Sequence, residues 1–217
     1  MKLVLFDCDG TLVDSASLIH ETMRRTFLHF EKPEPTLAQT KAIIGLTLDI
    51  AIARMLGRPH AGDEEVEMMA YYKSLFSVVR KELDFHEPLF DGIRQLIDTI
   101  GPRDDLRIGA VTGKSRRGLN HLMEIHGFDK HFVVSRTADE CPSKPHPAMV
   151  TECCDETGLV AGVTLVIGDA IYDMQMAKAA GATAIGVSWG YATVDDLWNA
   201  GADAIVDHPS ELLVHIG

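Results

Sequence analysis

Six short apolar runs, separated by amphipathic stretches, constrain the fold of this chain more than any other feature of its sequence. The runs are rich in β-branched residues and are continuous more than alternating, which is typical of strands covered on both faces of a sheet. They lie at residues 3–6, 106–111, 132–134, 163–167, 183–187 and 204–206. Helical patterns lie between them, for example at residues 91–100, 116–126, 147–157 and 172–181. Strands that alternate with helices predict an α/β fold with a doubly wound parallel sheet.

The segment from residue 15 to residue 85 breaks this alternation. It has no convincing strand pattern and instead has helical patterns at residues 15–30, 36–44, 48–56 and 63–83. Pro33 and Pro35 separate the first two patterns, and Gly57-Arg58-Pro59 separates the last two. We therefore predict an α/β catalytic core of residues 1–14 and 86–217, with an α-helical cap domain of residues 15–85 inserted after the first strand.

Composition and charge narrow the classes of function. The formal net charge of −12 disfavours binding to nucleic acid or to an acidic membrane surface, because both favour basic proteins. No run approaches the roughly 18 apolar residues of a membrane span, and the apolar N-terminal run is too short for a signal peptide. The 4 cysteines form no CxxC pair, so we expect buried, reduced thiols in a cytoplasmic protein. Nothing in the sequence indicates an oligomeric state.

Polar side chains follow three of the predicted strands at the point where each strand ends. The carboxyl ends of parallel strands share one edge of the sheet, which is where open α/β folds place their sites. The three segments are Asp7-Cys8-Asp9-Gly10-Thr11, Thr112-Gly113-Lys114, and Gly168-Asp169 with Asp173 further on. A fourth segment, Ser143-Lys144-Pro145-His146-Pro147, precedes a helical pattern.

The residue types in these segments indicate phosphoryl transfer with a divalent cation. Several carboxylates at one edge repel one another unless a cation neutralises them. Oxygen ligands without clustered histidines favour Mg²⁺ over zinc or copper, and none of the 10 histidines falls in a zinc-binding pattern. A threonine hydroxyl, a glycine amide and a lysine suit the oxygens of a phosphoryl group.

Together, the four segments resemble the signature motifs of the haloacid dehalogenase (HAD) superfamily: DxDGT, a strand ending in threonine, a lysine before proline, and GDxxxD. Their order and spacing agree with that family over the whole chain, including a helical cap after the first motif. Leu12-Val13-Asp14-Ser15 and Lys144-Pro145-His146-Pro147 are similar to the phosphoglycolate phosphatase-like branch. The resemblance implies a phosphatase that hydrolyses a small phosphorylated metabolite, a phosphomonoester similar to phosphoglycolate.

The resemblance also implies the catalytic roles. Asp7 would attack phosphorus and form an aspartyl-phosphate, which divides one difficult hydrolysis into two easier steps. Asp9 would protonate the leaving oxygen and later deprotonate the attacking water. Asp7, the carbonyl of Asp9 and Asp169 would hold Mg²⁺, which offsets the repulsion between an anionic nucleophile and an anionic phosphoryl group.

The remaining motif residues would bind the phosphate and support the metal. Lys144 would neutralise Asp7 and hold the phosphate, while Thr112 and the Gly113 amide would bind the equatorial oxygens. We expect Asp173 to orient Lys144 or metal-bound water, without binding the metal directly.

Structural roles compete with these assignments. Asp7 and Asp9 could cap a turn, Thr112-Gly113 could be a plain strand-to-helix turn, and Lys144 could be a surface lysine. Asp173 could be a solvated acid in the first turn of a helix.

Two residues depart from the family pattern, and the activity has alternatives. Ala170 stands where a serine or threonine is frequent, and Gly113 where asparagine is frequent, which weakens any transfer of substrate specificity.

The second acid of the first motif, Asp9, indicates phosphate-ester chemistry and is shared with a β-phosphoglucomutase-like phosphotransferase. A pyrophosphatase of the same superfamily and a non-catalytic binding protein are further alternatives.

The residues that select the substrate are expected on the cap. Arg24, Arg25 and Arg54 could reach an anionic tail or be solvated helix residues. Gly45-Leu46-Thr47 is either a loop that faces the cleft or a helix junction. Lys114, Arg116 and Arg117 could raise the local potential after the second motif, although a solvated helix start is favoured for the two arginines.

Overall fold

The computed structural model describes all 217 residues and has a six-stranded parallel sheet in the order β3-β2-β1-β4-β5-β6. The strands are β1 (Lys2–Phe6), β2 (Leu106–Thr112), β3 (Phe132–Thr137), β4 (Thr164–Gly168), β5 (Thr183–Val187) and β6 (Ala204–Val206). The predicted doubly wound α/β fold is confirmed. The first strand lies at the centre, between β2 and β4, so the direction in which strands are added to the sheet reverses beside it.

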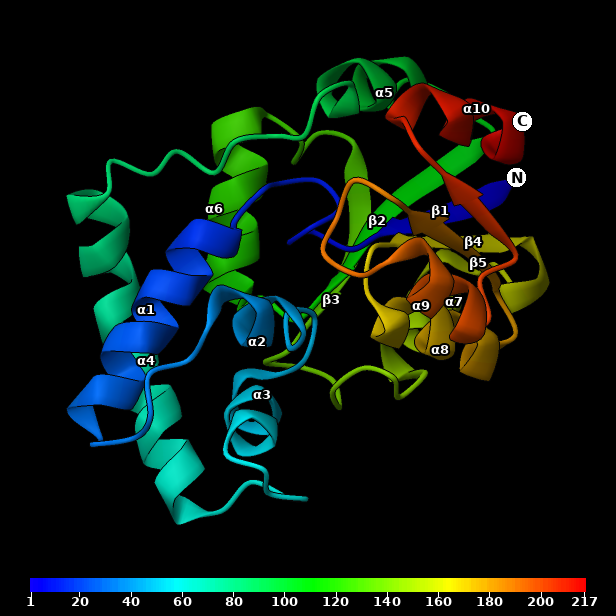
Figure 1. Cartoon of the computed structure of the whole chain (residues 1–217). Coiled ribbons are helices and arrows are strands. Elements are labelled where there is room, and N and C mark those ends of the chain that lie inside the picture. Colours follow the sequence, from blue (N-terminus) through cyan, green and yellow to red (C-terminus); the bar gives the residue numbers. More distant parts are fainter.

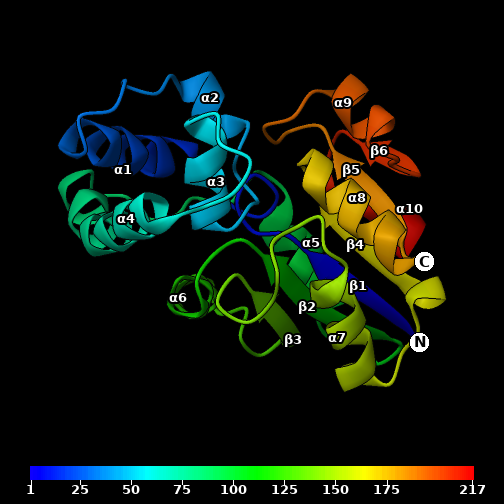
Figure 2. The same ribbon diagram turned by 90° about the horizontal axis from the view of Figure 1, so that it is seen from below.

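Two layers of helices cover the sheet because side chains alternate between its faces. On β1, Val4 and Phe6 point into a core shared with α5 (Ile93–Ile100), α6 (Arg116–His126) and α10 (Leu212–Ile216). Leu3 and Leu5 point into a second core, shared with α7 (Ala148–Thr157), α8 (Ile171–Ala180) and α9 (Val194–Asn199). Figure 2 shows α7 and α8 together on one side of the strands. Apolar residues on both faces explain the continuous runs of the sequence.

Residues after β1 form a group of helices beside the sheet: α1 (Ala16–His29), α2 (Leu37–Lys41), α3 (Leu48–Met55) and α4 (Asp63–Glu82). They lie at one end of the molecule, away from both chain termini (Figure 1). Met23, Ile52 and Met68 are completely buried within them, so this group has an apolar core of its own. We call residues 15–85 the cap; its boundaries stay a prediction.

The structure differs from the predicted elements in three places. The third strand extends to Thr137, beyond the predicted residue 134, because it is an edge strand whose polar Ser135 and Arg136 are only half-buried. Residue 163 belongs to a short 3₁₀ helix (Ala161–Val163) that precedes β4. The second cap helix ends at Lys41, and turns continue the chain to Gly45, which has a φ of 101°.

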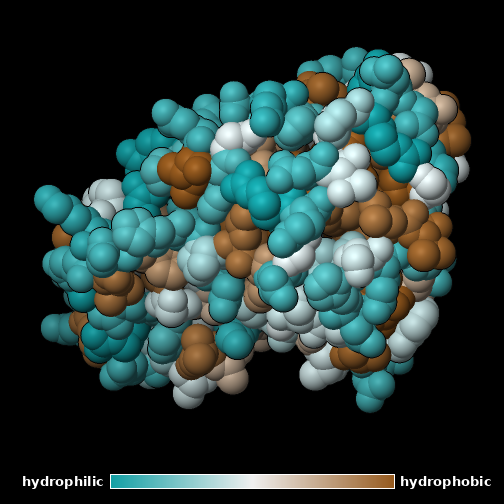
Figure 3. Space-filling view, turned by 90° about the horizontal axis from the view of Figure 1, so that it is seen from above, coloured by the Kyte–Doolittle hydropathy of each residue, from teal (hydrophilic) through white to brown (hydrophobic).

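The C-terminal helices α9 and α10 and a second 3₁₀ helix, Pro209–Glu211, were not predicted. All are shorter than two full helical turns, so they show little periodicity. The four cysteines are buried, as predicted. None of the helices combines the length and the apolar composition needed to cross a bilayer. Hydrophilic side chains cover most of the face in Figure 3, and apolar ones lie in separate groups.

Candidate active site

The predicted site residues of three strands meet at one edge of the sheet because of the strand register. Phe6 of β1 is paired with Ala110 of β2 and with Ile167 of β4. Asp7 therefore follows its strand next to the ends of both neighbours, where Thr112 and Asp169 lie. This edge is the point where the strand order reverses, which is where doubly wound sheets bind ligands.

Asp7 is a buried carboxylate whose two oxygens have no hydrogen-bond partner. The ammonium nitrogen of Lys144 lies 3.0 Å from Oδ1 of Asp7 and forms an ion pair with it. Burial raises the pKa of Asp7 to about 7, although the Lys144 charge opposes this shift. A carboxylate that has lost its water without gaining hydrogen bonds is costly by itself, so Asp7 is suited to a cation or an electrophile.

Lys144 connects Asp7 to Asp173. Its ammonium group donates a hydrogen bond to Oδ1 of Asp173 at 2.7 Å, and both side chains are buried. The other oxygen of Asp173 accepts the backbone N–H of Ala170 at the start of α8 at 3.1 Å. Asp173 therefore holds the Lys144 side chain in place at the N-terminus of α8. Neither Lys144 nor Asp173 is the solvated surface group that the sequence left possible.

Asp169 is also buried, and both of its oxygens accept hydrogen bonds. Thr11 donates to Oδ1 at 2.9 Å, and the backbone N–H of Tyr191 donates to Oδ2 at 2.9 Å. Gly10, with a φ of 86°, packs directly on this carboxylate, and a Cβ there would lie 2.2 Å from Oδ2. Burial, followed by the charges of Asp173 and Asp7, raises the pKa of Asp169.

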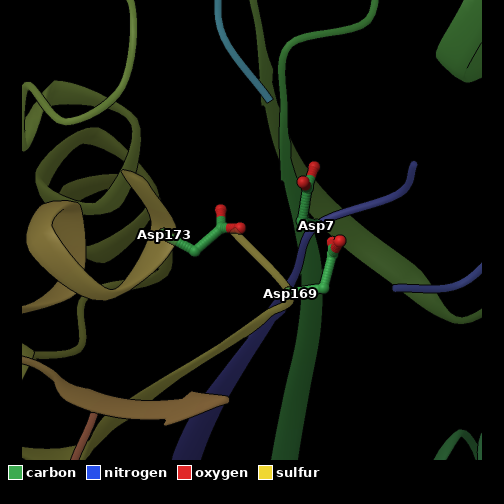
Figure 4. A group of neighbouring side chains, drawn as sticks. All are labelled: Asp7, Asp169 and Asp173. Carbon is green, nitrogen blue, oxygen red and sulfur yellow. The ribbon is translucent and has the colours of Figure 1, made fainter. Parts of the chain in front are cut away.

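The carboxylates of Asp7, Asp169 and Asp173 form a cluster in which one oxygen of each lies within 4.8 Å of the others. Figure 4 shows their side chains converging from β1, from the end of β4 and from α8. The donors are all hard oxygen atoms, and the two oxygens of Asp7 accept no hydrogen bond. This donor set fits a hard divalent cation. Asp173 accepts hydrogen bonds from Lys144 and from the Ala170 N–H, whereas Asp7 accepts none.

Asp9 has a different set of partners, none of which belongs to this cluster. Its Oδ1 accepts a hydrogen bond from Ser15 and lies 2.9 Å from the Lys114 ammonium nitrogen. The same nitrogen lies 3.4 Å from the Glu87 carboxylate. Glu87 is itself buried and pairs with Arg80 of α4 at 3.4 Å. A row of alternating charges therefore runs from the cap helix to Asp9.

Thr112 and Gly113 occupy the turn after β2. Thr112 is buried, and its hydroxyl accepts the backbone N–H of Lys114 at 3.2 Å. Gly113 touches the cap: a Cβ there would lie 2.8 Å from the Leu46 carbonyl oxygen and 2.9 Å from that of Gly45. Glycine at this position lets the cap loop approach the core closely, which is a structural reason for its departure from the family pattern.

A cleft of ≈ 810 Å³ opens between the cap and the core. Asp9 and Gly113 line it, whereas Asp7, Lys144 and Asp169 do not. Its cap side comes from α1, residues 43–51 and α4, and its core side from residues 113–121 and 138–143. Gly45-Leu46-Thr47 therefore faces the cleft, which decides between the two readings left open by the sequence.

The three cap arginines considered from the sequence do not line this cleft. Arg24 and Arg25 both pair with Glu21, and Arg54 donates a hydrogen bond to the Tyr172 hydroxyl at 2.6 Å. None of the three lines the cleft. Of the residues after the second motif, Lys114 and Arg117 line it, while Arg116 turns outward to Glu140. Lys114 is thus part of the site, not only a contributor to local potential.

Sequence reasoning missed four residues that support the site. Thr11 and Tyr191 hold Asp169, and Ser15 and Glu87 hold Asp9 directly or through Lys114. Thr11 and Ser15 lie within or beside the first motif, so proximity could have indicated them. Glu87 and Tyr191 have no signal of this kind, because they reach the site only through the tertiary fold.

This chain is similar to known hydrolases over most of its length. The family described as haloacid dehalogenase-like hydrolase matches residues 4–187. A probable phosphatase IndB of Dickeya dadantii (strain 3937) is 31% identical over 97% of this chain and 91% of its own length. A phosphoglycolate phosphatase of Yersinia pestis is 29% identical over 99% of this chain and 92% of its own. The crystal structure of a hydrolase from Pseudomonas syringae superposes with a TM-score of 0.85 at 23% identity, covering 100% of this chain and 98% of that one.

Proposed function

This chain belongs to the haloacid dehalogenase-like hydrolases, and within that family we propose that it is a Mg²⁺-dependent phosphatase of small phosphorylated metabolites with Asp7 as its nucleophile. The family and its phosphatase-named relatives make the chain a phosphoric monoester hydrolase. The cation, the substrate and the roles of individual residues belong to the proposal.

The state of Asp7 is the observation that carries the proposal. Its carboxylate is buried and without hydrogen bonds, beside the Lys144 ammonium group and the Asp169 carboxylate. A carboxylate with a purely structural role would be hydrogen-bonded, as Asp173 is. An unsatisfied anion next to a fixed cation is instead suited to attack a phosphoryl group that the cation attracts.

The reaction then has two steps on Asp7. An oxygen of Asp7 bonds to phosphorus while the ester P–O bond breaks, and Asp9 gives its proton to the leaving alcohol oxygen. In the second step, Asp9 takes a proton from a water molecule whose oxygen bonds to phosphorus. The bond between phosphorus and Asp7 breaks, inorganic phosphate leaves, and both aspartates return to their starting states.

The surrounding groups hold the phosphoryl oxygens during both steps. Lys144 supplies positive charge, and Thr112 with the Gly113 amide supplies donors at the end of β2. Asp7, Asp169 and the Asp9 backbone carbonyl would hold Mg²⁺, which supplies charge neutralisation of the phosphoryl group when bound. Asp173 keeps Lys144 in place from the start of α8.

Release of inorganic phosphate from an aryl phosphate and from an alkyl phosphate in Mg²⁺ tests these roles. Asp7→Asn should lower the rate by at least about 10⁴-fold on both substrates, because the nucleophile is lost. Asp9→Asn should cost about 10²–10⁴-fold on the alkyl phosphate and less on the aryl phosphate, whose leaving group needs little protonation.

The matched control is Asp155→Asn, an exposed aspartate of α7, which should keep full activity. Turnover by a folded Asp7→Asn protein would contradict the nucleophile assignment. Phosphate moved between sugar positions without release would indicate the phosphotransferase alternative. Activity on pyrophosphate alone would indicate a pyrophosphatase.

A further inference from the structure

The cap side of the cleft is an apolar wall. Met69, Tyr72 and Phe76 line it from α4, at a spacing that places all three on one helix face. Ile19 lines it from α1, where Met23 is completely buried in the core of the cap. In all, 13 of the 30 lining residues are hydrophobic. The cap helices thus present apolar faces to the cleft as well as to each other.

The positive charges inside the cleft are already neutralised by the protein. Lys114 lies 2.9 Å from Asp9 and 3.4 Å from Glu87, and Arg80 lies 3.4 Å from Glu87. Lys73 lies 3.6 Å from Asp139. Arg117 has no such partner, but its side chain is exposed. Each of these cations except Arg117 therefore already has a carboxylate of the protein beside it, and Glu87 stays between Lys114 and Arg80 when Asp9 carries its proton.

The cleft lies on the leaving-group side of the site. Asp9, which gives its proton to the leaving oxygen in the proposed reaction, lines the cleft, and the nucleophile Asp7 does not. The organic part of the substrate therefore extends from Asp9 towards the apolar wall. A volume of ≈ 810 Å³ falls within the range of pockets that enclose drug-sized ligands, which is far more than a two-carbon acid fills.

We propose that the substrates are phosphomonoesters whose organic part carries an extended apolar or aromatic body, bound between α1 and α4 of the cap, and not short phosphorylated acids. This inference rests on the proposed phosphatase function. It assigns Met69, Tyr72 and Phe76 to substrate selection. Burial, and secondarily the charge of Asp9, raise the pKa of Tyr72, which agrees with a place for this residue near the reacting end of the cleft.

Phosphate release from a series of n-alkyl phosphates, from methyl to octyl, tests the proposal because the leaving alcohols differ in length and hardly in acidity. Each methylene that is buried against the apolar wall should raise kcat/KM about fourfold, until the wall is filled. Phosphoglycolate should be a poorer substrate than hexyl phosphate.

Phe76→Ala should lower kcat/KM for hexyl phosphate about tenfold and change that for methyl phosphate less than twofold. Phe76→Leu, which keeps the core of the cap filled, should retain most of the length dependence. The matched control is Val78→Ala on the outer side of the same helix, where Val78 is 48% exposed; it should leave the whole series unchanged.

The possible results separate this inference from the proposed function. No phosphate release from any phosphomonoester would overturn the phosphatase proposal itself. Release with phosphoglycolate as the best substrate, or with no dependence on chain length, would overturn the apolar substrate class alone. A length dependence that survives unchanged in Phe76→Ala would overturn the assigned wall.

Discussion

The polar edge of the sheet and the cap cleft are adjacent, but their charged side chains are balanced in different ways. At the sheet edge, Lys144 is buried between Asp7 and Asp173, and the carboxylates outnumber the cation. In the cleft, Lys114 and Arg80 lie beside Asp9 and Glu87, and the cap helices contribute an apolar wall. At the sheet edge, a buried carboxylate without hydrogen bonds remains available to react. In the cleft, the charged side chains pair with one another.

The sheet edge therefore serves the reaction, and the cleft serves substrate selection. The reacting groups are few and are fixed by the register of adjacent strands, so small displacements there are costly. The cleft is formed by several cap segments with interchangeable apolar side chains, so its composition can vary while the reaction stays the same. Three predictions test this difference between the sheet edge and the cleft.

Removing the cation from the sheet edge should have the largest effect. Lys144→Met leaves the carboxylates of Asp7 and Asp173 buried without their partner, which should cost about 3–5 kcal/mol of unfolding free energy at pH 8. The loss should be smaller at pH 5, where these carboxyl groups can take up protons. Urea unfolding at both pH values measures it.

The matched control is Lys178→Met, which removes a lysine from an ion pair with Asp203 on the surface, where its side chain is 47% exposed. It should cost less than about 1 kcal/mol. Equal losses for the two variants would contradict the claim that the sheet edge depends on its buried cation.

The binding of Mg²⁺ should show an intermediate effect that depends on pH. The pKa of Asp7 is raised to about 7 from 3.8, so the folded protein retains a proton that the unfolded chain has lost. The metal-free protein therefore loses stability as pH rises from about 4 to about 7. Binding of a cation to the ionised group reverses this loss.

Mg²⁺ should therefore stabilise the protein by about 2 kcal/mol more at pH 8 than at pH 5, as measured by unfolding with and without the ion. Asp169→Asn should abolish most of the difference, while Asp155→Asn should preserve it. Stabilisation by Mg²⁺ that is the same at both pH values would place the ion away from Asp7.

The smallest effect is expected where the two regions touch. Gly113→Ala introduces a methyl group 2.8 Å from the Leu46 carbonyl oxygen. This overpacking should displace the cap loop and lower kcat/KM up to about tenfold, equivalent to about 1.4 kcal/mol. The control is Gly162→Ala, whose Cβ meets nothing within 4 Å. Unchanged kinetics in Gly113→Ala would show that the cap loop does not need this close contact.

The sequence predicted the sheet edge well because strand order and register determine it. Asp7, Thr112 and Asp169 each follow a buried strand, and the ends of parallel strands must meet at one edge. Lys144 lies outside a strand, so its place beside Asp7 depended on the family resemblance. The roles of these residues stay predictions, although their positions match.

The cleft could not be predicted in the same way. Met69, Tyr72 and Phe76 have the spacing of an apolar helix face, but periodicity does not say whether such a face covers a core or a cavity. Glu87 lies 27 residues before Lys114 in the chain, and no local pattern marks that contact. Arg54 was a candidate for an anionic substrate tail, but it bonds to Tyr172 of the core instead.

The junction between β1 and α1 has a consequence for how the molecule unfolds. The first N–H groups of α1 are usually satisfied by the side chain of the preceding residue, here Ser15, but that hydroxyl is engaged by Asp9. The Tyr191 hydroxyl accepts the N–H groups of Ser15 and Ala16 instead, each at 3.0 Å. An excised fragment of residues 15–85 would lose the two hydrogen bonds to Tyr191 that hold the start of α1 against the core, so its melting temperature should fall below that of the same helices in the intact chain.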